Sequence, residues 1–202
     1  MKTSPWKSIP RWLPQSLAAL VVLAAAMSWL RIPRSVEEAR MEDLELREGV
    51  LLRRLDGRPF SGKVVSRDPN GPLRSASMVV GGRLHGLSEG WHANGMIQVR
   101  ETFVAGRSEG VRTKWRHDGS RESEAGIRGG RLHGRFVRWD AEGRPTEEAW
   151  FVDGLPAGEA RQWHPDGSLK SWCRLEDGKV VESQRWSPGE KPDGTAVVAQ
   201  TR

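Results

Sequence analysis

The chain has 202 residues, of which 32 are lysine or arginine, 26 are aspartate or glutamate and one is cysteine. Residues 1–40 hold six of the basic and two of the acidic side chains, so residues 41–202 keep 26 basic against 24 acidic ones. This near balance lacks the basic face that phosphate backbones need, which argues against nucleic-acid binding. The single cysteine, Cys173, excludes an intramolecular disulfide and a thiolate metal cluster, and we expect it to be a small core-facing residue.

Residues 1–30 have the features of a targeting segment, with a basic start over 1–11 and an apolar run over 17–30. The stretch 13–30 lies in length between a signal-peptide core and a membrane span. Trp12 and Trp29 flank it as interfacial anchors do, which favours an uncleaved signal anchor over a cleaved signal peptide. A core helix is a third interpretation. We expect a hydrophobic helix here that leaves the rest of the chain exported. The protein would then be single-pass in an inner membrane, or secreted or periplasmic after cleavage.

Two short segments precede the main part of the chain. Residues 31–43 are predicted to be a linker with a short helix, because Ser35 and Glu38 fit a capping box. Residues 44–62 are predicted to be a capping hairpin that starts the sheet, since the apolar segments 44–46 and 50–52 flank a turn at 47–49.

Residues 63–182 consist of five copies of a 24-residue unit, which start at Lys63, Leu87, Val111, Arg135 and Glu159. Position five of the unit is tryptophan in four copies, and position twenty-four is glycine in the first four. Glycine also stands at positions nine and twenty throughout: Gly71, Gly95, Gly119, Gly143 and Gly167, then Gly82, Gly106, Gly130, Gly154 and Gly178. A repeat of this length indicates stacked supersecondary units.

Each unit is predicted to be a β-hairpin. Pro165, Asp166 and Gly167 suit successive positions of a three-residue loop that ends in a glycine bulge, so that position five pairs with position eleven. A tight turn is expected at positions nineteen and twenty, and a bulge at the glycine of position twenty-four. The predicted fold is all-β: an antiparallel meander of about ten strands from five hairpin repeats, preceded by the N-terminal hydrophobic helix. Residues 183–202 are predicted to be a cap strand and a disordered tail.

Two sets of apolar side chains form the predicted spine of this sheet. Positions five and seventeen are both odd-numbered, so strand alternation predicts that they share one buried face. These residues are Trp91, Trp115, Trp139 and Trp163, with Phe103, Ile127, Phe151 and Leu175. An exposed aromatic groove for a glycan or a peptide is the alternative interpretation. Trp150 and Trp172 fall outside this register, so they are predicted on the opposite, charged face as candidate surface contacts.

Chemistry-bearing residues are spread along the repeats. His85 and His133 occupy the same repeat position two units apart, about 19 Å by the strand spacing, which is too far to share an ion. Glu124 and Glu148 are about 10 Å apart, beyond the separation of an inverting glycosidase pair. The glycine-containing segments lack the Gly-Lys-Ser/Thr of a phosphate loop. The sequence therefore predicts no catalytic residue, no cofactor and no metal site.

The segment LDGRPFSG at 55–62, the GRLHG segments at 82–86 and 130–134, and the Trp/Asn-Gly spacing resemble the variant class of MORN repeats. In particular, residues 44–182 are similar to bacterial proteins labelled antitoxins of the YwqK type. The resemblance implies a hairpin-repeat sheet with an interaction or scaffold role. We expect a non-enzymatic module that mediates protein–protein or cell-envelope contacts, with a protein or an envelope polymer as partner and the membrane reached through residues 13–30. The alternatives are a cytosolic antitoxin-like regulator and a lipid-surface binder.

Overall fold

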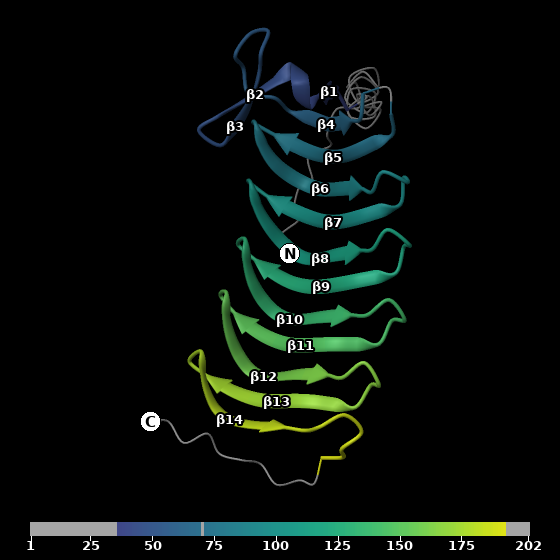
Figure 1. Ribbon diagram of the computed structural model, residues 1–202. Coiled ribbons are helices and arrows are strands. Elements are labelled where there is room, and N and C mark those ends of the chain that lie inside the picture. Colours follow the sequence, from purple (N-terminus) through teal and green to yellow (C-terminus); the bar gives the residue numbers. More distant parts are fainter. Residues whose placement is uncertain (1–35, 70, 193–202) are drawn as a thin grey trace, which may run out of the picture. The chain divides into compact units, whose positions relative to one another are not determined.

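A computed structural model describes residues 36–69 and 71–192 (Figure 1). The strands are β1 (Glu38–Arg40), β2 (Leu44–Arg47), β3 (Val50–Arg53), β4 (Gly62–Arg67), β5 (Leu73–Val80), β6 (Arg83–Trp91), β7 (Ile97–Val104), β8 (Arg107–Trp115), β9 (Arg121–Arg128), β10 (Arg131–Trp139), β11 (Pro145–Val152), β12 (Leu155–Trp163), β13 (Leu169–Glu176) and β14 (Lys179–Arg185). A single 3-10 turn, η1 (Met41–Asp43), is the helical element of these residues. None of their helices has the length and apolar character to cross a membrane.

Twelve of these strands form one sheet in the order β1, β4 and then β5 to β14 in sequence (Figure 1). The strands from β4 to β14 are all antiparallel to their neighbours, so this part is a meander of hairpins. The predicted all-β meander is confirmed, with eleven antiparallel strands and a parallel edge strand, β1. The predicted hydrophobic helix over 1–30 and the tail from 193 lie outside the described residues.

The three-residue hairpin loops follow the prediction. In the loop between β6 and β7, the N–H of His92 donates to the Met96 carbonyl at 2.8 Å and the N–H of Gly95 donates to the His92 carbonyl at 2.9 Å. Gly95 has φ +84°, in the left-handed region that glycine tolerates. Position five pairs with position eleven in all five copies: Arg67 with Leu73, Trp91 with Ile97, Trp115 with Arg121, Trp139 with Pro145 and Trp163 with Leu169. Gly119, Gly143 and Gly167 repeat the left-handed conformation of Gly95.

Two-residue turns connect β5 to β6, β7 to β8, β9 to β10, β11 to β12 and β13 to β14. Both residues of each turn have positive φ, as type I′ hairpins require. Position twenty is glycine in each, and position nineteen is Gly81, Ala105, Gly129, Asp153 or Asp177. Ala105, at φ +49°, is the side chain least suited to this conformation.

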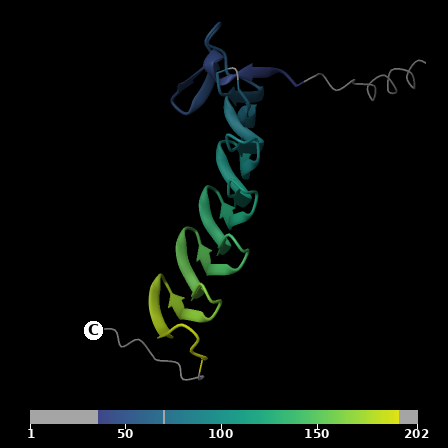
Figure 2. The ribbon, with the colours of Figure 1, turned by 45° about the vertical axis from the view of Figure 1, so that its right-hand side comes forward.

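Glycines at position twenty-four bend the strands. Between the pairs Ser77–Ser88 and Val79–Leu84, β5 advances two residues while β6 advances four, and Gly86 lies in the bulge at φ +96°. The same offset recurs at Gly110, Gly134 and Gly158. A bulge bends its strand, and the strands are visibly curved (Figure 2). In the fifth copy Glu182 replaces the glycine. Between the pairs Arg174–Glu182 and Leu175–Val180, β13 advances one residue while β14 advances two.

The predicted common face of positions five and seventeen is wrong. Glu89 and Trp91 share a face of β6, and Arg100 pairs with Glu89, so Arg100 and Trp91 share that face. Phe103 is three residues beyond Arg100 on β7 and therefore lies on the other face. The physical reason is a second bulge: the register shifts by one residue between Gly90 and Trp91, which leaves position twelve unpaired and reverses the alternation after it.

The face that carries position seventeen holds most of the covered apolar side chains. Val79 is 1% exposed and Ile127 is 5% exposed, and Ala125 and Ala149 of the adjacent row are also buried. Phe136 packs edge-on against Phe151, the position-seventeen residue of the next strand, with ring centroids 6.3 Å apart.

The N-terminal end carries the tightest cluster of the described residues. Leu44, Leu51 and Phe60 pack with Val64 and Val79 of the sheet. Within the capping hairpin predicted over 44–62, the strands are β2 and β3, and they form a separate two-stranded sheet that does not start the large one.

Of the short helix predicted over 31–43, the described residues keep only the 3-10 turn η1 at Met41–Asp43. Glu38–Arg40 form β1, which pairs with β4 in parallel, and the N–H of Lys63 donates to the Glu37 carbonyl at 2.8 Å. Ala39 packs against the hydrophobic cluster. Pairing of the free β4 edge satisfies backbone groups that a helix would leave open, and it outweighs the local capping signal.

Candidate interaction face

Six tryptophans share one face of the sheet, which we call the tryptophan face. It is defined by positions one, three and five of one strand and their partners at sixteen, fourteen and eleven of the next. Trp91, Trp115, Trp139 and Trp163 form a row along it. Since neighbouring strands are about 4.8 Å apart, successive members of this row are about 9.6 Å apart.

Trp150 and Trp172 belong to this same face, contrary to the prediction that they lie opposite the row. Trp150 pairs with Arg135 of β10, an even number of residues from Trp139, and Trp172 pairs with Arg161 of β12, two residues from Trp163. The bulge at position twelve again explains the error, because it moves positions fourteen and sixteen onto the face of position five.

Trp186 continues the row, although the sequence repeat did not reveal it. The Nε2 atom of His92 contacts the Trp115 carbonyl at 2.9 Å, and the Nε2 atom of His164 contacts the Trp186 carbonyl at the same distance. Trp186 thus occupies the place that position five would have in a sixth copy, although it comes one residue earlier in the sequence. The reason is that the bulge at Glu182 has one residue fewer than the glycine bulges of the other copies. Its indole is 8% exposed, and its Nε1 is buried with no hydrogen-bond partner.

The charges of the tryptophan face cancel within it. Arg100 pairs with Glu89 at 2.8 Å, and Arg135 pairs with Glu148 at 2.6 Å. From Glu89 onward the rows hold five arginines and five glutamates, each in at least one ion pair: Arg100, Arg121, Arg135, Arg161 and Arg174 with Glu89, Glu124, Glu148, Glu159 and Glu182. Between Glu89 and Glu182 these rows therefore offer aromatic and aliphatic surface with no net charge.

Much of this apolar surface is accessible. The four indoles of the row are half-buried, Trp150 is 36% exposed, and Leu87 and Val111 at position one are 44% and 55% exposed. The guanidinium of Arg100 lies 5.8 Å from the centroid of the Trp115 ring, within the range of a cation–π contact. Exposed apolar side chains in a repeated array on one face make it a candidate interaction surface.

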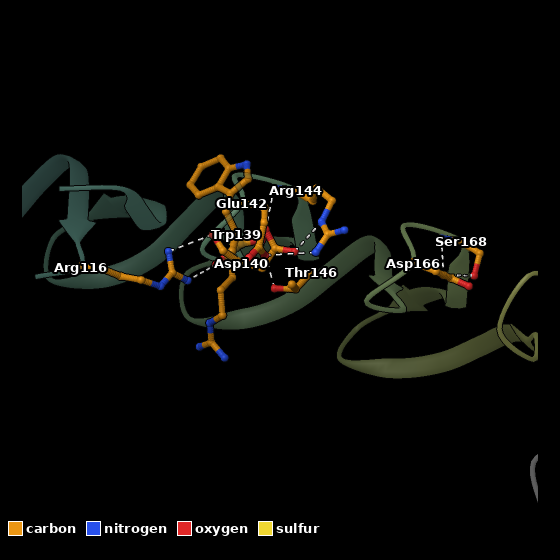
Figure 3. Close-up of polar contacts among 9 residues, drawn as sticks. Arg116, Trp139, Asp140, Glu142, Arg144, Thr146, Asp166 and Ser168 are labelled. Atoms are coloured by element: carbon orange, nitrogen blue, oxygen red, sulfur yellow. Dashed lines mark hydrogen bonds and ion pairs between the residues drawn. The ribbon is translucent and has the colours of Figure 1, made fainter. Parts of the chain in front are cut away.

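The hairpin loops beside this row are tied to one another by side chains at position six. The guanidinium of Arg116 donates to the carbonyls of Trp139 and, at 3.1 Å, of Asp140 (Figure 3). It also donates to the Arg121 carbonyl at 2.6 Å. Within the next loop the guanidinium of Arg144 donates to the Asp140 carboxylate at 2.8 Å (Figure 3). Desolvation raises the pKa of Asp140, but the hydrogen bonds from Arg144 outweigh it and hold this pKa below its usual value. These contacts fix the spacing of successive tryptophans.

An open groove of about 490 Å³ lies where two of these loops meet. Its lining includes His92, Lys114, Trp115, His117 and Glu122. The two histidine rings lie 5.5 Å apart between centroids, and the amide of Asn94 donates to the His117 carbonyl at 2.7 Å. The groove therefore adjoins the tryptophan row at Trp115, and its other named lining side chains are polar or charged.

His85 and His133 have structural partners at the opposite strand ends. The N–H of Ala105 donates to Nδ1 of His85, and that of Asp153 to Nδ1 of His133, both at 3.4 Å. Among residues 36–69 and 71–192, no three side chains of His, Cys, Asp and Glu are placed to hold a metal ion. Cys173 is partly buried, and burial raises the pKa of its thiol.

No family model matches the chain, and no curated protein matches it either. Among solved structures, it is similar to a mutant of S. aureus TarM in complex with fondaparinux, alpha-GlcNAc-glycerol and UDP, at 12% identity and TM-score 0.32 over 48% of this chain. A second TarM structure matches at 13% identity and TM-score 0.31 over 47% of this chain. In both cases the matched part is 19% of the other chain.

Proposed function

We propose that this chain is a non-enzymatic β-hairpin repeat module that binds another protein or an envelope polymer along the tryptophan face. The observation that supports it is the placement of six tryptophans on one face whose charges are paired within it. One feature recurs about every 9.6 Å, so a repetitive ligand gains affinity through several weak contacts at once.

The regular spacing of glycine and tryptophan in the repeats supports membership of the variant MORN class. The units start at Lys63, Leu87, Val111, Arg135 and Glu159. The apolar segment 13–30 supports tethering to a membrane, or export, of the repeats. A periplasmic reporter fused after Arg202 tests the location. Activity of a reporter that works only outside the cytoplasm is the expected result, and activity of a cytosolic reporter alone would contradict export.

Binding is tested with the variants Trp150→Ala and Trp172→Ala against immobilised peptidoglycan, glycans and peptides. Each variant removes an indole from the tryptophan face, so we expect about a tenfold loss of affinity from each. Gln162→Ala is the matched control, because Gln162 is an exposed β12 residue between Arg161 and Trp163 that points to the other face. Wild-type binding retained by both tryptophan variants would refute a role for this face.

A further inference from the structure

The geometry of the tryptophan face points to an uncharged, proline-rich segment in the polyproline II conformation as its ligand, and this inference rests on the proposed function. The first argument is the spacing of the row. A polyproline II helix rises about 3.1 Å per residue with three residues per turn, so one of its sides repeats about every 9.3 Å. The tryptophans recur about every 9.6 Å.

Other regular peptides do not fit this spacing. An extended strand returns a side chain to the same side about every 6.7 Å, and an α-helix completes a turn every 5.4 Å. From Trp91 to Trp163 the row spans three repeats, about 29 Å. Ten residues of polyproline II cover about 28 Å, so prolines at the first, fourth, seventh and tenth positions reach all four indoles.

The second argument is charge. The arginines and glutamates of the tryptophan face neutralise one another, as in the group of Arg135 and Arg161 with Glu148 and Glu159, where the two arginines contact Glu148 at 2.6 and 3.7 Å and Arg161 also pairs with Glu159. An acidic or basic polymer would find no unpaired opposite charge there and would have to break these pairs. An uncharged ligand leaves them intact.

The third argument is the state of the indoles. Each indole of the row is half-buried, so it offers part of a ring to a ligand. A proline ring is small enough to pack between successive indoles, as proline-rich peptides do in aromatic-lined grooves. Polyproline II has no internal hydrogen bonds, and its carbonyls can accept from indole N–H groups, which are donors only. A pyranose stacks flat and needs a whole open ring face.

The test is isothermal titration of the full chain with synthetic peptides. The first is a ten-residue peptide with proline at every third position and uncharged polar residues between. The second has the same composition with irregular proline spacing, and the third keeps two prolines three residues apart. We expect the first to bind at least tenfold more tightly than the second and the third, since each proline that meets an indole adds a contact.

Two protein variants accompany the peptides. Trp150→Ala keeps the row and is expected to lower the affinity about tenfold, whereas Trp139→Ala interrupts the row and should lower the affinity by a larger factor. The peptide comparison uses the wild-type chain, so a variant that fails to fold leaves the test intact. Equal affinity for regular and irregular peptides would overturn the inference. So would binding of chito- or cello-oligosaccharides without binding of the peptides, although that result would support the proposed function.

Discussion

Two glycines at the same bulge are expected to resist substitution for different reasons, and they offer a direct test of how the sheet is bent. Gly134 has φ +88°, and a Cβ added there would meet nothing within 4 Å. Gly126 has an ordinary φ, but a Cβ there would lie 2.2 Å from the His133 carbonyl oxygen. The first glycine is required by its backbone conformation and the second by space.

The magnitudes follow from these two causes. An L-residue in the left-handed region costs about 1–2 kcal/mol, and alanine regains about 0.4–1 kcal/mol by restricting the unfolded chain, so Gly134→Ala should destabilise by at most about 1.6 kcal/mol. Gly126→Ala forces two strands apart, and overpacking of this kind costs about 1–3 kcal/mol, so we expect it at the upper end of that range.

The assay is urea unfolding followed by tryptophan fluorescence, with the midpoint and slope compared among variants. Gly134→Asn is the control, because asparagine tolerates the left-handed conformation and should destabilise less than alanine there. The reasoning would be refuted if Gly134→Ala were as destabilising as Gly126→Ala, or if asparagine at 134 were worse than alanine.

Three further predictions concern turns and loops. Ala105→Asn should stabilise the chain by about 0.5–1 kcal/mol, seen as a higher thermal midpoint, because it relieves an alanine at positive φ; a lower midpoint would contradict this. Hydrogen bonds from the hydroxyl and N–H of Ser120 lower the pKa of Asp118, so its stabilisation is present above the unfolded pKa of about 3.9 and is lost as the pH falls through the folded value. The gap in thermal midpoint between wild type and Asp118→Asn should therefore close on acidification, and a constant gap would count against it. Arg116→Ala should lower the free energy of unfolding in urea by about 1–3 kcal/mol, because the carbonyls of Trp139 and Asp140 lose their donor. Arg116→Lys should restore little of this stability, since an ammonium lacks the planar, forked donors of a guanidinium. Full rescue by lysine would argue against a role for the guanidinium geometry.

The sequence alone determined the local structure of the repeat. Glycine after asparagine or aspartate in four copies, and after Glu142 in the other, specified the hairpin loops, and the resulting pairing of Trp91 with Ile97 and its equivalents was predictable in every copy. The two-residue turns and the glycine bulges were predictable for the same reason, because each depends on backbone conformations that few residues adopt. Strand β1 was missed, because its pairing with β4 depends on residues about 25 positions later in the chain.

The faces of the sheet were decided only by the tertiary structure. Assigning all odd-numbered positions of a hairpin to one face assumes that side chains alternate without interruption. One unpaired residue at position twelve reverses the alternation. The tryptophan row therefore lies on the opposite face from the residues at position seventeen: Phe103, Ile127, Phe151 and Leu175. The same residue brings Trp150 and Trp172 beside the row, and a bulge shortened at Glu182 places Trp186 at its end. Periodicity gives the pairing of neighbours, whereas the side of the sheet depends on bulges that leave no hydrophobic signature of their own.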